Sequence, residues 1–293
     1  MGDLKHVPVL LNEAIFYLNV RKGMKYIDAT FGGGHHTREI IKRGGIVLGI
    51  DADGQSLEKA KEAFRHEIKN EQVILIAGNF RNIERIAKEA NFKGVEGIFF
   101  DLGLSSWQID ESARGFSYLR DEDLDMRFAK IVGSPTGAEI LEKADFNELF
   151  NIIGKYGEEE LASQIAKKII SARKENKIGK SGELAALLDK EFAYLPYKRR
   201  IQLLSRVFQS IRIAVNDEIN ALIEGLDQAI AILDKGGRLA VISFHSIEDR
   251  IVKIRMRGRK LKSLTKKPVL ASRKEIIKNR RSRSAKLRAA EKK

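Results

Sequence analysis

Hydrophobic and polar positions alternate in blocks along the first third of the chain. Short apolar runs, rich in β-branched and aromatic residues, are separated by longer stretches with helical periodicity, such as QSLEKAKEAFRHEI. The runs with the composition of buried strands are KYIDATF at 25–31, GIVLGID at 45–51, QVILIAG at 72–78, VEGIFFDLG at 95–103 and, much later, GGRLAVISF at 236–244. This alternation is typical of an α/β protein with a doubly wound sheet.

The long interval between the fourth and fifth of these runs has almost no strand signal. It contains capping-box helix starts, TGAE at 136–139 and DFNE at 145–148, and amphipathic segments such as SGELAALLDKEF. We therefore predict an all-helical domain inserted at residues 112–199.

The sheet domain is accordingly predicted in two parts, residues 1–111 and 200–293. The second part opens with a helical stretch, RRIQLLSRVFQSIRIAVNDEINALIEGLDQAIAIL, that is too long for one ordinary helix. We expect this stretch to break near Asn216.

Composition narrows the chemistry available to the 293-residue chain. It contains no cysteine, which excludes disulfides, thiolate metal sites and cysteine nucleophiles. Asp3, Lys5, His6 and Glu13 interrupt the apolar pattern at the N-terminus, which is untypical of a signal peptide or a membrane span. We therefore expect a cytoplasmic protein that does not cross a membrane.

The net charge of +14 is concentrated at the C-terminal end. Between residues 251 and 293 lie 18 Lys and Arg against two Glu, whereas the rest of the chain is close to neutral. The planar guanidinium of Arg suits phosphate, and the terminal NRRSRSAKLR adds Ser and Asn donors. A solvated surface is the alternative, but the pattern favours a polyanionic partner such as a nucleic acid.

A glycine-rich bend, FGGGHHT at 31–37, follows the first predicted strand, and Asp51 ends the second one. Glycines let the backbone approach a ligand, and an acid at that strand end can bind ribose hydroxyls. The bend lacks both a Walker lysine and the third small residue of a dinucleotide fingerprint. Adjacent histidines do not share a helix face, so no metal site is expected there. S-adenosylmethionine is the nucleoside cofactor that fits this pattern.

Two further groups of candidate site residues lie at predicted strand ends. Asp101 ends the fourth strand and is a candidate ligand for an amine, although an acid that merely caps a turn is the alternative. Phe244 and His245 follow the fifth strand in ISFHSIEDR and are candidates for contact with a flipped base. The alternative is that Ser246 is the N-cap of the next helix and Phe244 belongs to the core.

Several longer blocks resemble one family. HVPVLLNEA, DATFGGGHHT, DLGLSSWQIDESARGFSYLRDEDLDMRF, YGEEELA, FQSIRIAVNDE, GGRLAVISFHSIEDRIVK and NRRSRSAKLR occur in the order found in the bacterial enzymes that methylate N4 of a cytidine in the decoding region of 16S ribosomal RNA. The blocks run from residue 6 to about 288, so the resemblance covers nearly the whole chain. It implies a class I methyltransferase fold, Rossmann-like, with an inserted helical domain and S-adenosylmethionine as methyl donor.

The resemblance also implies roles for individual residues. The positions that match the family's cofactor contacts are Gly34, His35, His36, Asp51, Phe80, Asp101 and Gln108. Two positions depart from the family: His35 replaces a usual Gly, which strains the bend if its φ is positive, and Trp107 replaces a usual Pro, which adds a stacking surface for a base.

For catalysis we expect Asp101 to accept the hydrogens of the amine, with Ser105 and Ser106 as orienting residues. Substrate RNA is expected at Trp107, Phe244, His245, Arg280, Arg281 and Arg283, within the small ribosomal subunit. Arg114, Arg120 and Arg127 are either phosphate ligands or partners of the acids Glu111, Asp121, Asp123 and Asp125. A nicotinamide-dependent oxidoreductase and a non-catalytic RNA-binding protein are the rival classes.

Overall fold

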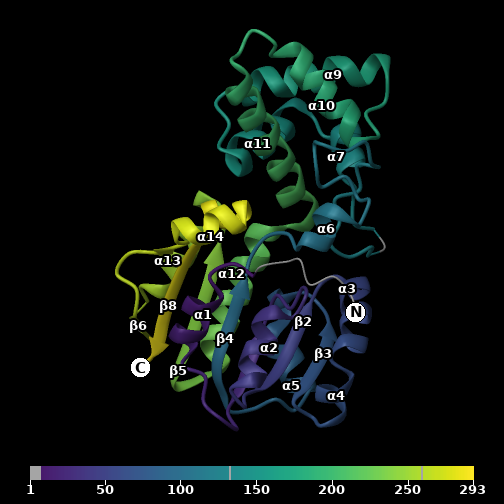
Figure 1. Ribbon diagram of the computed structural model, residues 1–293. Coiled ribbons are helices and arrows are strands. Elements are labelled where there is room, and N and C mark those ends of the chain that lie inside the picture. Colours follow the sequence, from purple (N-terminus) through teal and green to yellow (C-terminus); the bar gives the residue numbers. More distant parts are fainter. Residues whose placement is uncertain (1–7, 132, 259) are drawn as a thin grey trace. The chain divides into compact units, whose positions relative to one another are not determined.

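The computed structural model describes residues 8–131, 133–258 and 260–293, without the side chain of Ser106 (Figure 1). The start of the first resemblance block, His6 and Val7, lies outside the described residues. The chain forms two compact units. The first comprises Met1–Gly103 and Ile219–Lys293, and the second comprises Leu104–Glu218.

The first unit is built on an eight-stranded sheet. Its strands are β1 (Lys25–Asp28), β2 (Ile46–Asp51), β3 (Val73–Ala77), β4 (Val95–Asp101), β5 (Leu233–Ser243), β6 (Leu261–Ser263), β7 (Val269–Leu270) and β8 (Lys286–Lys292). The order is β3-β2-β1-β4-β5-β8-β6, with β7 also paired to β8. β1 to β5 are parallel to one another, while β8 is antiparallel to β5. All five predicted strands are confirmed.

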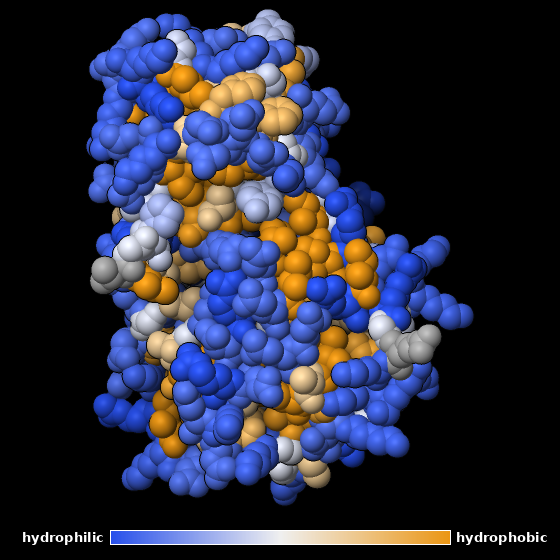
Figure 2. Space-filling view, turned by 180° about the vertical axis from the view of Figure 1, so that it is seen from behind, coloured by the Kyte–Doolittle hydropathy of each residue, from blue (hydrophilic) through white to orange (hydrophobic). Residues whose placement is uncertain are grey.

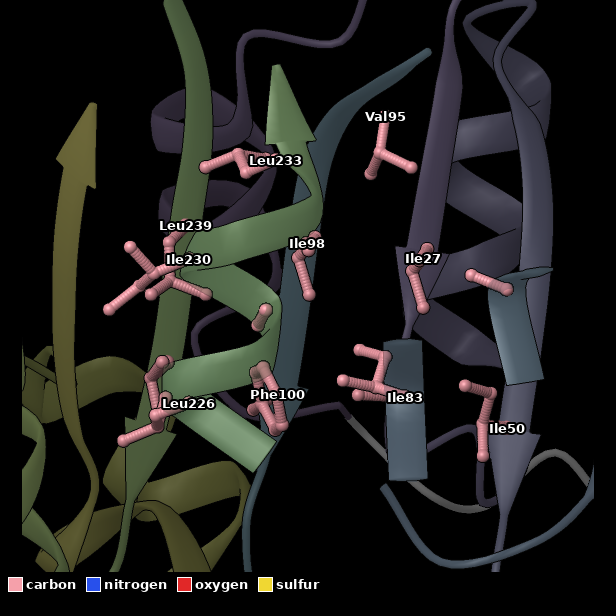
Figure 3. Close-up of a cluster of buried hydrophobic side chains, with 14 of the residues drawn as sticks. Ile27, Ile50, Ile83, Val95, Ile98, Phe100, Leu226, Ile230, Leu233 and Leu239 are labelled. Carbon is pink, nitrogen blue, oxygen red and sulfur yellow. The ribbon is translucent and has the colours of Figure 1, made fainter. Parts of the chain in front are cut away.

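The first four strands are largely apolar because both faces of the sheet are covered. Ile98 and Phe100 of β4 belong to one buried cluster, whereas Phe99 between them belongs to another, as the period of two in a strand requires. Figure 3 shows Ile98 and Phe100 beside Leu226 and Ile230. The helices and turns of this unit are α1 (Leu11–Leu18), α2 (His35–Lys42), α3 (Gly54–Ala63), α4 (Arg65–Lys69), η1 (Phe80–Asn82), α5 (Ile83–Glu89), α12 (Glu218–Ile232), α13 (Ser246–Met256), α14 (Arg273–Lys278) and η3 (Arg280–Ser284).

The second unit has its own helical core. It comprises α6 (Ser106–Asp110), α7 (Gly137–Lys143), α8 (Phe146–Asn151), the π-helix η2 (Ile152–Tyr156), α9 (Ala162–Glu175), α10 (Ser181–Glu191) and α11 (Tyr197–Asn216). Both predicted capping boxes are present, Thr136 with Glu139 and Asp145 with Glu148. Extended pairing in the described part of this unit is limited to one isolated bridge, between Asp123 and Lys180.

The second unit extends beyond the predicted 112–199 on both sides. Helix α11 buries Leu203, Val207 and Ile211 in the core of this unit, so the chain leaves it only after Asn216. The predicted break there is confirmed, because Asp217 adopts a left-handed conformation with φ 48° between α11 and α12.

The surface is largely polar. Figure 2 shows one face on which hydrophilic residues predominate, in keeping with a chain of which 32% is charged. Among the described residues, no helix combines the length and the apolar character needed to cross a bilayer. Those same residues contain no group of three or more His, Asp or Glu side chains placed to hold a metal ion.

Candidate functional site

The glycine bend is held by backbone hydrogen bonds and by two aromatic rings. The amide of Phe31 donates to the carbonyl of Ile50 at 2.8 Å, and that of Gly34 donates to the carbonyl of Phe31 at 2.8 Å. Gly34 has φ 70°, and a Cβ there would lie 2.6 Å from the rings of Phe31 and Phe64. His35 is the first residue of α2 and does not have a positive φ. The departure from the family at His35 therefore introduces no strain.

Asp51, at the end of β2, fixes this bend to the sheet. Its carboxylate accepts the amide N–H of Gly32 at 2.6 Å and that of Asp53 at 2.8 Å. Burial raises the pKa of Asp51 to about 6, against the opposing effect of the Asp53 and Gly32 hydrogen bonds. Since a carboxylate has about four lone-pair sites, two donors leave acceptor capacity for hydroxyl groups of a ligand.

Asp28, at the end of β1, is a second buried acid. It is 1% exposed, accepts the Thr37 hydroxyl at 2.7 Å and lies 3.3 Å from the Thr30 amide nitrogen. Burial raises the pKa of Asp28 to about 6, an effect that the hydrogen bond from Thr37 reduces. The sequence interpretation missed Asp28 because the predicted strand ran on to Phe31, whereas β1 ends at Asp28.

Replacing Asp28 with Asn is expected to reduce the pH dependence of folding stability. A pKa raised to about 6 means that the folded chain binds this proton more tightly than the unfolded chain. The stabilisation from Asp28 is thus complete below about pH 4 and is lost as the pH rises through about 6. Two pKa units correspond to roughly 3 kcal/mol. We expect melting temperatures measured from pH 4 to pH 7 to fall less steeply in Asp28→Asn than in the wild type. Parallel curves would contradict this assignment.

Asp101, at the end of β4, presents an acceptor without a protein donor. Its backbone amide donates to the Thr30 hydroxyl oxygen at 2.6 Å. Its Oδ1 is buried and accepts no hydrogen bond from the described residues, while the side chain as a whole is 25% exposed. Burial first, then the charges of Asp28 and Glu248, raise the pKa of Asp101 well above its ordinary value. A ligand that donates hydrogens to Oδ1 would satisfy this carboxyl group.

His36 faces Asp101 from helix α2. Its ring is buried, packs against Phe99 at a tilt of 41° with ring centroids 4.3 Å apart, and places Nδ1 3.8 Å from Asp101 Oδ2. The Nε2 atom lies 3.2 Å from the carbonyl oxygen of Val9. The side chain of His36 is thus directed toward protein groups, unlike a typical exposed ligand contact.

Phe244 and His245 lie at the exit from β5. His245 is the N-cap of α13 and forms a capping box with Glu248, so the expectation that Ser246 is the cap is wrong by one residue. The buried Glu248 carboxylate accepts the amide of Phe244 at 2.8 Å and lies 3.1 Å from His245 Nε2. The ring of Phe244 is half-buried against the core cluster that contains Phe99. Glu248 is a second site residue that sequence reasoning missed, because its capping role depends on that one-residue shift.

Phe80 is the first residue of η1 and packs partly into the first unit. Its ring centroid lies 5.5 Å from that of Phe100 in an edge-on arrangement, and a Cβ on Gly225 would lie 2.8 Å from the ring. The side chain is therefore half-buried rather than buried, and part of it is accessible.

Three candidates, Ser105, Trp107 and Gln108, belong to the second unit. Ser105 is the N-cap of α6 and forms a capping box with Gln108, which is only 7% exposed. The guanidinium of Arg114 lies 5.2 Å from the centre of the Trp107 ring. The predicted orienting role of Ser106 concerns a side chain that lies outside the described residues.

The arginines of the loop before α7 have protein partners. Arg127 forms two hydrogen bonds to Asp125, at 2.6 and 3.1 Å, so the pairing alternative holds for this residue. Arg114 is buried and donates to the carbonyls of Arg127 and Phe128. Arg120 contacts Asp110 at 3.7 Å and Glu122 at 3.6 Å rather than the predicted acids.

Arg280, Arg281 and Arg283 are exposed on η3. Directly after them the chain enters β8, where Leu287, Ala289 and Ala290 are buried. The basic C-terminal segment therefore combines a cationic surface with an internal strand of the sheet.

The strand order, the antiparallel strand β8 beside β5, and acids at the ends of β1, β2 and β4 are those of the class I methyltransferase fold. A family model described as the MraW methylase family matches residues 3–293. The chain belongs to this family.

Two curated relatives match this chain over nearly their full length. The chain is 42% identical to the Ribosomal RNA small subunit methyltransferase H of Dictyoglomus thermophilum, over 98% of this chain and 96% of the relative. It is also 42% identical to the protein of that name from Carboxydothermus hydrogenoformans, over 99% and 98%. The solved structure of a putative rRNA-methylase from Clostridium thermocellum aligns with 98% of this chain and 100% of its own, at 13% identity and a TM-score of 0.47.

Proposed function

We propose that this protein transfers a methyl group from S-adenosylmethionine to the exocyclic N4 amine of one cytidine in the decoding region of 16S ribosomal RNA. The observation that carries the proposal is Asp101, whose buried Oδ1 at the carboxyl end of β4 is an acceptor with no donor among the described residues. An exocyclic amine supplies two such donors. Family membership and the names of the relatives support ribosomal RNA as the substrate.

The residues of the first unit fit the methyl donor. Asp51 would accept the ribose hydroxyls, the bend at Gly34 to His36 would contact the rest of the donor through its backbone, and the exposed part of the Phe80 ring would flank the adenine. Gln108 is assigned to the same ligand by its match to the family. When bound, the donor supplies an electrophilic methyl group on a sulfonium.

The protein's contribution to the reaction is mainly positioning. The cytosine amine is a weak nucleophile because its lone pair is delocalised into the ring, so acceptors at its hydrogens favour the pyramidal nitrogen of the transition state. The nitrogen–carbon bond forms as the carbon–sulfur bond breaks, and one amine proton then leaves to water or to Asp101. Ser105 and Ser106 would orient the amine.

Base and backbone contacts are assigned to separate groups of residues. Trp107, Phe244 and His245 would contact the flipped cytosine. The exposed Arg280, Arg281 and Arg283 would contact RNA phosphates, within a small ribosomal subunit in the cytoplasm. The positive charge of residues 251–293 supports a polyanionic substrate.

Replacing Asp51 with Ala is expected to weaken donor binding at least tenfold, because each charge-assisted hydrogen bond contributes roughly 1.5–3 kcal/mol. It also removes the acceptor of the Gly32 and Asp53 amides, so a lower melting temperature should accompany the weaker binding. Asp51→Asn keeps one carbonyl acceptor. Its donor affinity and melting temperature should therefore lie between those of the wild type and of Asp51→Ala. Titration with S-adenosylhomocysteine measures the effect, and an unchanged dissociation constant in Asp51→Ala would move the ribose site elsewhere.

The identity of the methylated nucleoside tests the proposed function. Small ribosomal subunits that lack the modification are incubated with the enzyme and a labelled methyl donor, and their nucleosides are analysed by mass spectrometry. Label in N4-methylcytidine supports the proposal, whereas label in 5-methylcytidine, in an adenosine or on ribose refutes it. Thermal stabilisation by NAD instead of S-adenosylhomocysteine would favour an oxidoreductase.

A further inference from the structure

A series of polar contacts in the first unit leads from Asp101 to the C-terminal basic segment. It begins with His36, whose Nδ1 faces Asp101 Oδ2 at 3.8 Å and whose Nε2 contacts the Val9 carbonyl oxygen at 3.2 Å. A carbonyl only accepts hydrogen bonds, so Nε2 carries the proton in this contact. In the neutral ring Nδ1 is then an acceptor, which attracts the Asp101 carboxyl group only when that group is protonated, whereas a protonated ring donates from Nδ1 to the ionised carboxylate. Val9 therefore sets both the tautomer and the orientation of His36.

The peptide group between Val9 and Leu10 is held from both sides. Its carbonyl contacts His36, and its N–H donates to Glu275 Oε1 at 2.7 Å. Because a peptide group is planar, a contact on the N–H fixes the direction of the carbonyl as well. Leu10 is fully buried and has φ 49°, a left-handed conformation that is unfavourable for leucine and needs support from its surroundings.

Glu275 comes from helix α14 of the basic segment. Ser272 is the N-cap of this helix and accepts the amide N–H of Glu275 at 3.2 Å. Arg273, Lys274 and Lys278 of the same helix are exposed, whereas Glu275 is half-buried. Helix α14 thus presents cations to solvent and one carboxylate to the Val9–Leu10 peptide group.

We propose that His36 and Glu275 are positioning residues for Asp101: Glu275 fixes the Val9–Leu10 peptide group, this group fixes His36, and His36 fixes the Asp101 carboxyl group. The other titratable groups that affect Asp101 are the acids Asp28 and Glu248, which carry like charge and do not donate when ionised. The proposal rests on the proposed function only in that Asp101 serves methyl transfer.

Two substitutions test the contacts of the two ring nitrogens of His36 one at a time. In His36→Gln the side-chain amide reaches the position of Nε2 and keeps the Val9 contact, but nothing replaces Nδ1. We expect kcat to fall about tenfold, since a misplaced group can cost up to about a hundredfold, and the pH profile of kcat to shift. His36→Asn, with a polar atom near Nδ1 and none at Nε2, should also be less active. Folding is checked by thermal melting and by S-adenosylhomocysteine binding. A folded His36→Gln enzyme with wild-type kcat and pH profile would overturn the proposal.

Glu275 is tested against a control in the same helix. Glu275→Ala removes the acceptor of the Leu10 amide and should lower kcat several-fold with the same change in pH profile as His36→Gln. Glu275→Gln retains an acceptor oxygen and should restore the wild-type value. Ser272→Ala weakens the start of α14 but leaves Glu275 in place, so it should have little effect. If Ser272→Ala and Glu275→Ala reduce kcat equally, Glu275 acts only through helix stability and the proposal fails.

A double-mutant cycle tests whether the two residues act in series. If they do, Glu275→Ala combined with His36→Gln should be no slower than the slower single variant, whereas independent effects would multiply and overturn the link. Rates are measured as total labelled methyl incorporated into small ribosomal subunits, whichever atom is modified. An acceptor other than N4 would therefore refute the proposed function without deciding the role of His36 and Glu275.

Discussion

Replacing Asp101 with Ala is expected to lower the rate of methyl transfer by at least about a hundredfold, the scale seen when one preorganised hydrogen-bonding group is removed from an active site. The expected effect on stability has the opposite sign. The carboxyl group lies near two other acids, and its buried Oδ1 has no donor among the described residues, so its removal relieves an unfavourable environment. The melting temperature of Asp101→Ala should equal or exceed that of the wild type at neutral pH.

The pH dependence of kcat is a second test of the role of Asp101. Because its pKa is raised well above the ordinary value, the carboxylate form becomes available only as the pH rises. If the ionised form accepts the amine hydrogens, kcat should increase with pH through this pKa, and the increase should be absent in Asp101→Asn. Binding of S-adenosylhomocysteine is the control, since the same carboxyl group is proposed to contact both ligands. Full activity in a folded Asp101→Ala protein would remove Asp101 from the reaction.

The features that could be predicted from the sequence depend on local pattern. The five parallel strands have continuous apolar runs because both faces of the sheet are buried, and Asp51 and Asp101 could be identified because such runs end at them. The capping boxes at Thr136 and Asp145 also follow from residues only three positions apart.

Features that depend on distant packing could not be predicted in the same way. β8 has the sequence KLRAAEK, which lacks the β-branched and aromatic residues typical of strands, and it is a strand because β5 lies beside it. The buried ring of His36 contacts Val9, 27 residues away, and no spacing in the sequence indicates that contact. The boundary of the second unit is set by the packing of α11, which periodicity alone does not assign to either unit.

Deleting residues 286–293 is expected to abolish folding of the first unit, although most of the removed residues are polar or small. β8 pairs with β5 on one side and with β6 and β7 on the other, so its removal exposes the edges of three strands. It also exposes apolar surface that Leu287 covers and leaves Asp249 without Arg288, which donates to it at 2.6 and 3.1 Å. These effects together are comparable with the whole stability of a typical domain, about 5–15 kcal/mol.

The matched comparison is a variant in which Arg280, Arg281 and Arg283 are all replaced by Gln. These side chains are exposed and lie outside β8, so the variant should melt cooperatively and bind S-adenosylhomocysteine like the wild type. Its affinity for small-subunit RNA should fall, and the slope of log affinity against log salt should flatten by about 0.7 for each phosphate that the protein no longer neutralises. Circular dichroism melting and RNA titrations at several salt concentrations separate the two roles of the segment.

A chain that lacks residues 286–293 but still melts cooperatively near the wild-type temperature would show that β8 is dispensable for the sheet. An unchanged salt slope in the triple variant would show that these arginines do not contact phosphate.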